Sequence, residues 1–175
     1  MDKLVKINFS MGKIEYDMYQ DIPKNEDGSE NLINGESFSR FDNYLNKCIN
    51  EETIPDSNLY DATTNRYIYY IDDYPIGEVG IRTTLNQFWT ERGSQIFYKV
   101  RLSERRKGYG SKMLKLALEE CKKMNMEQVR INCNDLNSGS KKIILKNGGV
   151  LDISNYETEE GTSSSYIIKL IEHEK

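Results

Sequence analysis

The stretch that decides the fold is a basic, glycine-bearing turn, Arg105-Arg106-Lys107-Gly108-Tyr109-Gly110-Ser111. It follows residues 95–102, in which apolar side chains alternate as in a β-strand. It precedes residues 111–124, in which apolar side chains recur at helical spacing. A strand–helix–strand unit requires a parallel pair, so we expect residues 128–133 to form the second strand beside residues 95–102.

This turn has the physical features of an anion site. A helix N-terminus offers unpaired backbone N–H groups and a partial positive charge. Gly108 and Gly110 let the backbone approach a ligand closely, and the three preceding cations add to the field. These features together favour a phosphate ligand. The alternative is a tight turn whose charges are only solvated.

The glycine spacing excludes two common phosphate motifs. A P-loop needs four residues between its first glycine and a Gly-Lys pair. A dinucleotide fingerprint needs a third glycine, and Met113 stands at that place. The turn instead resembles the acetyl-CoA pyrophosphate loop of the GNAT superfamily of N-acetyltransferases. That family's pattern is Arg or Gln, two residues, Gly, one residue, and Gly or Ala, and Arg105, Gly108 and Gly110 match it.

A second GNAT signature lies further along the chain. It consists of an asparagine, a small residue and a glycine, and Asn137, Ser140 and Gly148 stand at those places. The resemblance covers residues 66–171 and extends to the whole chain, residues 1–175, which we read as a single domain. The phrase around Gly148 looks most like a bacterial subgroup of the family.

The resemblance implies that acetyl-CoA lies in a gap between residues 95–102 and the following parallel strand. The backbone of Val100, Arg101 and Leu102 is then expected to pair with the pantetheine arm. The N–H groups of Lys107, Gly108, Tyr109, Gly110 and Ser111 are expected to bind the pyrophosphate, with Arg105 and Lys107 reaching the phosphates. Asn137 and Ser140 are expected at the pantetheine end. Arg106 is either a further phosphate contact or a solvated cation, and Tyr109 either packs or stacks.

The chemistry implied is direct attack of a neutral amine on the thioester, without a covalent enzyme intermediate. The first candidate base is Glu78, for which the alternative is an exposed strand carboxylate. Tyr98 is a candidate acid or orienting group, or a core residue. Cys133 is rejected as a nucleophile because the sole histidine, His173, lies near the C-terminus. Asn132 and Asn134 offer polar contacts to a substrate.

One position departs from the family pattern. Many GNAT members carry a tyrosine seven residues after the motif asparagine, where it protonates the leaving thiolate; this chain has Ile144. The departure supports a rival reading, a catalytically silent acyl-CoA-binding module that acts as a sensor or interaction partner. The main reading is an acetyl-CoA-dependent N-acetyltransferase acting on a primary amine.

Composition bounds the remaining classes. The 175 residues carry a net charge of −4, which argues against general nucleic-acid binding. Residues 1–62 hold 13 acidic and 6 basic side chains, and the remainder holds 15 and 18. The acidic part fits either a cationic small-molecule acceptor or an ordinary soluble surface.

The lone histidine and the spacing of the three cysteines offer no metal site. No signal peptide or membrane span is visible, so a cytoplasmic location is expected. A homodimer stays open.

Apolar periodicity predicts an α/β fold of the mixed α+β kind. Strands are expected at residues 3–9, 66–71, 76–82, 95–102, 128–133, 150–153 and 166–171, and helices at residues 12–19, 37–49, 111–124 and 137–147. Residues 21–36, 51–65 and 156–165 are polar and are expected to be loops. The GNAT resemblance implies a central mixed, mostly antiparallel sheet with a splayed parallel pair and helices on both faces.

Overall fold

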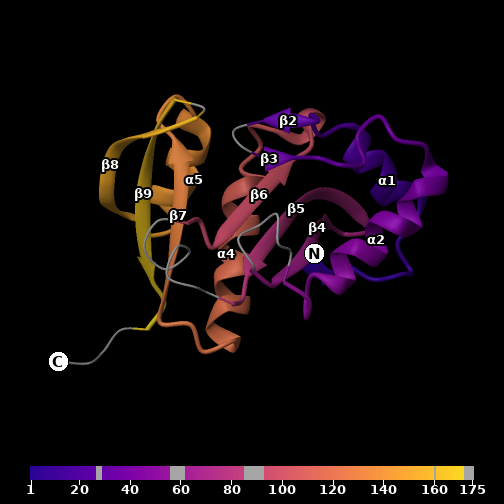
Figure 1. Ribbon diagram of the computed structural model, residues 1–175, viewed down its shortest axis with the longest axis horizontal. Helices are drawn as coiled ribbons and strands as arrows, with labels where there is room; N and C mark the ends of the chain where they lie inside the picture. Colours follow the sequence, from indigo (N-terminus) through magenta and orange to yellow (C-terminus); the bar gives the residue numbers. More distant parts are fainter. Residues whose placement is uncertain (27–28, 56–61, 85–92, 160, 172–175) are drawn as a thin grey trace.

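The chain folds into two main antiparallel sheets that meet at one edge of each, together with a small two-stranded sheet at residues 25–26 and 29–30 (Figure 1). The computed structural model describes residues 1–26, 29–55, 62–84, 93–159 and 161–171. The elements are β1 (Asp2–Lys6), α1 (Lys13–Gln20), β2 (Asn25–Glu26), β3 (Ser29–Glu30), η1 (Phe38–Arg40), α2 (Phe41–Asn50), β4 (Thr64–Ile71), β5 (Tyr74–Arg82), β6 (Ile96–Val100), η3 (Leu102–Glu104), α4 (Tyr109–Lys123), β7 (Gln128–Asn134), α5 (Ser138–Lys146), β8 (Val150–Thr158) and β9 (Gly161–Lys169). One sheet has the order β1-β4-β5-β6 and the other has the order β7-β9-β8. The predicted mixed α/β fold is confirmed.

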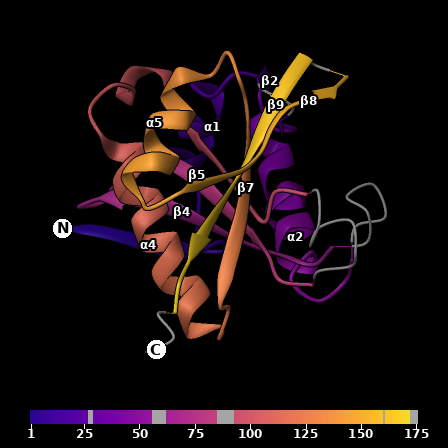
Figure 2. The same ribbon diagram turned by 90° about the vertical axis from the view of Figure 1, so that its left-hand side faces the viewer.

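Helices cover both faces of the first sheet, as Figure 2 shows with α4 and α2 on opposite sides of β4 and β5. Side chains of β4 alternate between two apolar clusters. Tyr67 and Tyr69 belong to the cluster under α4, and Ile68 and Tyr70 belong to the cluster under α1 and α2. β4 is buried on both faces, where a charged side chain costs free energy unless it is paired. A charged side chain that points into either cluster therefore needs a partner.

Several predicted boundaries were wrong. The strand expected at residues 3–9 ends at Lys6, and the loop expected at residues 21–36 contains β2 and β3. Residues 156–165 were expected to form a loop, but residues 156–158 belong to β8 and residues 161–165 to β9. Within it, the polar run Ser163–Ser165 pairs with β7, because the sheet uses its backbone groups whatever its side chains prefer. The strand expected at residues 95–102 ends at Val100, and the 3₁₀ turn η3 begins at Leu102.

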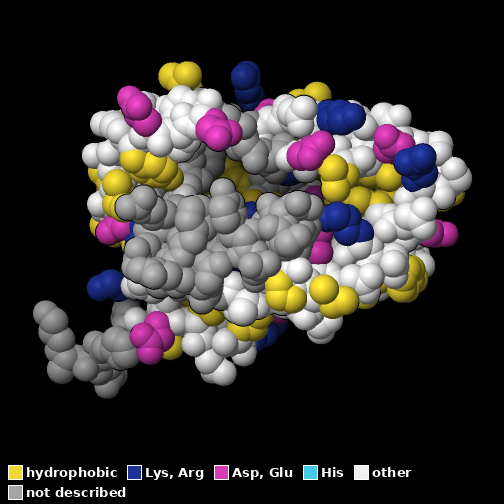
Figure 3. Space-filling model, in the orientation of Figure 1, with side chains coloured by type: hydrophobic (Ala, Val, Ile, Leu, Met, Phe, Trp, Pro, Cys, Tyr) yellow, Lys and Arg dark blue, Asp and Glu magenta, His cyan; other side chains and the backbone are white. Residues whose placement is uncertain are grey.

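The structure also bears on the expectations about membrane helices, metal sites and cysteines. None of the described helices is long and apolar enough to cross a membrane. Within the described ranges, no group of three or more histidine, cysteine or acidic side chains is placed to hold a metal ion. Cys48, Cys121 and Cys133 are buried, and none of them forms a disulfide. His173 lies outside the described residues. Acidic and basic side chains are interspersed on the face drawn in Figure 3.

Candidate functional site

The basic turn leads directly into α4, and its backbone geometry depends on Gly108. Gly108 is the N-cap residue of α4 and has φ +82°. A Cβ atom there would meet no heavy atom within 4 Å, so the backbone angle, rather than space, requires glycine. No side chain of the described residues caps this helix. The first N–H groups of α4 are therefore left for an anion.

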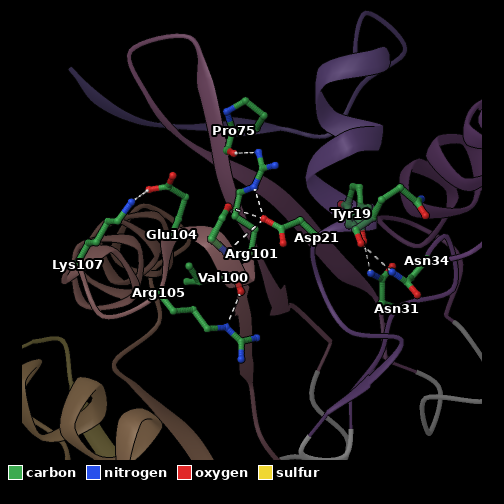
Figure 4. A network of polar contacts seen from close by, with 12 residues as sticks. Tyr19, Asp21, Asn31, Asn34, Pro75, Val100, Arg101, Glu104, Arg105 and Lys107 are labelled. Atoms are coloured by element: carbon green, nitrogen blue, oxygen red, sulfur yellow. Dashed lines mark hydrogen bonds and ion pairs between the residues drawn. The ribbon is translucent and has the colours of Figure 1, made fainter.

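The three cations of the turn have different surroundings. Arg105 donates from Nε to the carbonyl oxygen of Val100 at 2.9 Å, and its two terminal nitrogens donate to the carboxylate of Glu26, with Nη1 2.6 Å from Oε1. Figure 4 shows Arg105 turned toward Val100. Lys107 is ion-paired with Glu104 at 2.9 Å. Arg106 is exposed, with φ +63°, in the left-handed region that costs a side-chain-bearing residue energy.

Glu26 is a site residue that the sequence did not point to. It lies on the two-residue strand β2, far from both motifs in the chain. Its hydrogen bonds from Arg105 lower the pKa of its carboxyl below the usual value. The Arg105 guanidinium thus donates hydrogen bonds to the Glu26 carboxylate and to the Val100 carbonyl. From the sequence, it was expected to bind the cofactor's phosphates.

The backbone of β6 faces two directions. The N–H of Arg101 donates to Ile76 of β5 at 3.0 Å, and the N–H of Leu102 donates to Asp21 at 2.8 Å. These two amides are used within the protein. Figure 4 shows the Arg101 side chain nearby, donating to Asp21 and to the carbonyl of Pro75. Antiparallel pairing alternates along a strand. The backbone groups of Val100 and Tyr98 therefore point away from β5, toward β7.

β6 and β7 are linked by hydrogen bonds next to the start of β6. The N–H of Gln95 donates to the carbonyl of Arg130 at 2.8 Å, and the N–H of Arg130 donates to Gln95 Oε1 at 2.7 Å. Beyond this point the two strands belong to separate sheets. A gap thus opens between them, with the outward backbone of Tyr98 and Val100 on one wall and the turn before α4 at its open end.

Comparison with known families agrees with this arrangement. A model of the acetyltransferase (GNAT) domain matches residues 28–150, which is more than half of the chain. The chain belongs to the GNAT acetyltransferase family.

Solved structures show the same fold at low sequence identity. The GNAT chain resembles a spermidine N-acetyltransferase from Vibrio cholerae in complex with CoA and spermine (TM-score 0.63, 13% identity, 97% of this chain and 95% of that one). It resembles a ribosomal L7/L12 alpha-N-protein acetyltransferase in complex with coenzyme A (TM-score 0.68, 11% identity, 96% and 93%). It also resembles a putative acetyltransferase from Salmonella typhimurium with acetyl-CoA (TM-score 0.62, 10% identity, 100% and 97%). No curated protein matches the sequence.

The N-terminus of α5 brings three predicted site residues of this GNAT domain together. Asn137 is the N-cap, and its side-chain oxygen accepts the N–H of Ser140 at 2.9 Å. The Ser140 hydroxyl lies 2.8 Å from the Tyr98 hydroxyl. Burial raises the pKa of Tyr98 to about 12, against the opposing effect of the Ser140 hydrogen bond. The Tyr98 phenol therefore stays protonated at neutral pH.

Ile144, at the place where the family often has tyrosine, is a core residue. It is fully buried in the apolar cluster under α4, and its Cγ2 lies 2.4 Å from where a Cβ on Gly149 would stand. Ile144→Tyr is therefore expected to destabilise the domain by about 1–3 kcal/mol through overpacking. Urea unfolding measures this loss, and Leu145→Tyr, at a half-exposed neighbouring position, should leave stability almost unchanged. Equal stability of both variants would contradict the packing argument.

Glu78 is neither exposed nor alone. Its side chain is buried, and its Oε1 accepts Arg66 Nη1 at 2.8 Å. Arg66 Nε donates at the same distance to Glu51, and the Arg66 guanidinium lies over the Phe97 ring, 4.9 Å from its centroid. Glu78 is therefore held in a buried ion pair with Arg66. The alternative of an exposed strand carboxylate was wrong, and the ion pair weighs against the expected role as base.

One cavity among the described residues lies away from this gap. It has a volume of about 480 Å³ and lies between α4, the end of α5 and the end of β9, where Lys115, Lys146 and Lys169 contribute to its lining. The first turn of α4 packs on α5 here: a Cβ on Gly110 would stand 2.7 Å from Ile143 Cδ1. The gap between β6 and β7 has a different lining, with Tyr98 and Val100 on its wall.

Proposed function

We propose that this GNAT domain transfers an acetyl group from acetyl-CoA to a primary amine. The observation that carries the proposal is the uncapped start of α4, with Gly108 at φ +82°, at the open end of a gap walled by the outward backbone of β6. An uncapped helix N-terminus suits a pyrophosphate, and unpaired strand amides suit the amides of a pantetheine arm. The CoA and acetyl-CoA complexes of proteins with this fold support the same ligand.

The residues of the chain divide the work as follows. The N–H groups at the start of α4 bind the pyrophosphate, and the backbone of Val100 holds the pantetheine arm. Arg105 acts on Val100 and Glu26 rather than on phosphate. The amine nitrogen attacks the thioester carbonyl carbon, the carbon–sulfur bond breaks, and the CoA thiolate leaves. The amine proton goes to solvent, because we assign no side chain to that step.

Tyr98 protonates the leaving thiolate in this proposal, in place of the tyrosine that the family often has where Ile144 stands. Ser140, one helical turn before Ile144 on α5, orients the phenol. Tyr98→Phe is expected to lower kcat by about 100-fold, within the usual range for a general acid, with little change in KM. The defect should be constant from about pH 6 to about pH 9, because the Tyr98 pKa of about 12 keeps the phenol protonated there.

Steady-state kinetics across that pH range measures the effect. Tyr166→Phe, at another buried tyrosine of the same core, is the matched control and should keep kcat. Ser140→Ala should reproduce part of the Tyr98→Phe defect, because the phenol then loses its orienting partner. A Tyr98→Phe variant with unchanged kcat would remove Tyr98 from the mechanism.

The acceptor is proposed to be a small amine. Spermidine and aminoglycoside acetyltransferases share this fold, and the acidic first third of the chain attracts cations. Polyamines and aminoglycosides are therefore the first compounds to screen.

A second candidate function is a silent acyl-CoA-binding module. The buried Ile144 favours it, because that position offers no proton donor. The two functions differ in turnover: both bind acetyl-CoA, and only the enzyme releases free CoA in the presence of an amine.

Calorimetric titration with acetyl-CoA, followed by a thiol assay for free CoA with the amine panel, tests both functions. The expected result is micromolar binding, weaker for dephospho-CoA, and CoA release with at least one amine. Binding without release for any amine would favour the silent module. Absence of acetyl-CoA binding would overturn both.

A further inference from the structure

The open edge of β7 is capped by side chains. In a regular parallel pair, amides of one strand donate to carbonyls of the next. Here the N–H of Asn132 donates to the hydroxyl of Ser94 at 3.2 Å, and that hydroxyl donates to the carbonyl of Ile96 at 2.8 Å. The Ser94 hydroxyl therefore stands between an amide of β7 and a carbonyl of β6 that would otherwise meet directly.

The backbone N–H two residues earlier on β7, that of Arg130, also bonds to a side chain. The N–H of Arg130 donates to Gln95 Oε1 at 2.7 Å, while the backbone oxygen of Gln95 accepts the N–H of Arg82 on β5 at 2.8 Å. Gln95 is buried, with 5% of its surface exposed, so its side-chain oxygen is not available to solvent and bonds to Arg130 instead. The backbone of Gln95 thus bridges the two sheets, with its carbonyl oxygen paired to β5 and its N–H donating to the carbonyl of Arg130, while its side chain accepts the N–H of Arg130 on β7.

These two contacts have a consequence for the strands beyond them. Unpaired buried amides are costly, so two strands with free facing edges tend to pair. Ser94 and Gln95 satisfy the edge of β7 with side-chain oxygens at the apex of the gap. The N–H groups of Tyr98 and Val100, further along β6, then have no strand partner on that side and can bind a ligand, whereas the Val100 carbonyl accepts Arg105 Nε.

We propose that Ser94 and Gln95 are positioning residues that hold β6 and β7 apart and so keep the acetyl-CoA gap open. The proposal rests on the proposed function for the identity of the ligand and on the hydrogen bonds alone for the opening of the strands. Ser94 acts as a wedge between Ile96 and Asn132, and Gln95 acts as the hinge at Arg130.

The strand opening is tested without ligand by amide hydrogen exchange. On β6, the amides of Phe97 and Lys99 face β5 and should be protected, whereas those of Tyr98 and Val100 face the gap and should exchange faster. In Ser94→Ala the wedge is lost, and protection of Tyr98 should rise as the strands approach each other. Equal protection of all four amides in the unmodified protein would overturn the proposal.

The consequence for binding is tested by calorimetry with acetyl-CoA. Ser94→Ala and Gln95→Ala should each weaken binding by about tenfold, the scale of one hydrogen bond. Ser94→Thr and Gln95→Glu keep the accepting oxygen and should restore affinity. Ser154→Ala, at an exposed serine of β8, is the control for the serine substitution and should bind normally.

The results separate the two ideas. Unchanged affinity in Ser94→Ala and Gln95→Ala, or failure of the oxygen-retaining variants to restore it, would overturn the positioning role. If the unmodified protein did not bind acetyl-CoA at all, the proposed function would fail, while the exchange pattern of β6 would still report whether the strands are held apart.

Discussion

Gly108→Val is expected to abolish measurable acetyl-CoA binding while the fold is kept. Valine at φ +82° costs about 1–2 kcal/mol in the left-handed region, and its β-branch adds to the strain. The turn relieves this strain by rotating the N–H groups on either side, which are the groups proposed to hold the pyrophosphate. We expect affinity to fall by about 100-fold or more, which corresponds to about 2.7 kcal/mol. Calorimetric titration with acetyl-CoA measures it.

Gly35→Val is the matched control for this substitution. Gly35 has the same φ of +82° and, like Gly108, open space where a Cβ would stand, but it lies in the loop before η1. Both variants should lose similar stability in thermal unfolding, and only Gly108→Val should lose binding. Normal affinity in Gly108→Val would mean that the turn before α4 is not the cofactor site.

The sequence predicted the parts of the site that depend on local geometry. The glycine turn, the helix that follows it and the helix that begins near Asn137 all depend on residues that are close together in the chain. Residue types and spacing determine such features, since a left-handed turn and an N-cap each restrict the residues that can form them. The family pattern of the two motifs could be read for the same reason.

Long-range contacts of the site could not be predicted in this way. Glu26 meets Arg105 across 79 positions, and Gln95 meets Arg130 across 35. A single sequence does not reveal which carboxylate will meet which guanidinium, because many pairs of equal chemistry exist. The burial of Ile144 is likewise a property of packing. The place of Ile144 in the sequence does not by itself show whether its side chain faces the gap or the core.

Glu78→Gln is expected to cost about 3 kcal/mol of unfolding free energy, because the buried Arg66 guanidinium loses one of its two carboxylate partners and keeps only Glu51. For a domain of this size that corresponds to a fall in Tm of about 10 °C. If Glu78 serves the sheet and not the reaction, the rate of the folded variant relative to the unmodified enzyme should be equal at neutral and at alkaline pH. Thermal unfolding and initial rates at both pH values measure the two effects.

A carboxylate that acts as the base would give the opposite pattern. In that case the Glu78→Gln rate defect would be large at neutral pH and would shrink at alkaline pH, where more of the amine is already neutral. Glu119→Gln, which removes an exposed carboxylate paired with Lys122, should change stability by less than about 0.5 kcal/mol. Combining Glu78→Met with Arg66→Met should recover part of the stability lost in either single variant, because no uncompensated partner remains at that contact and Glu51 keeps Lys47. Additive losses would show that Arg66 and Glu78 do not stabilise each other.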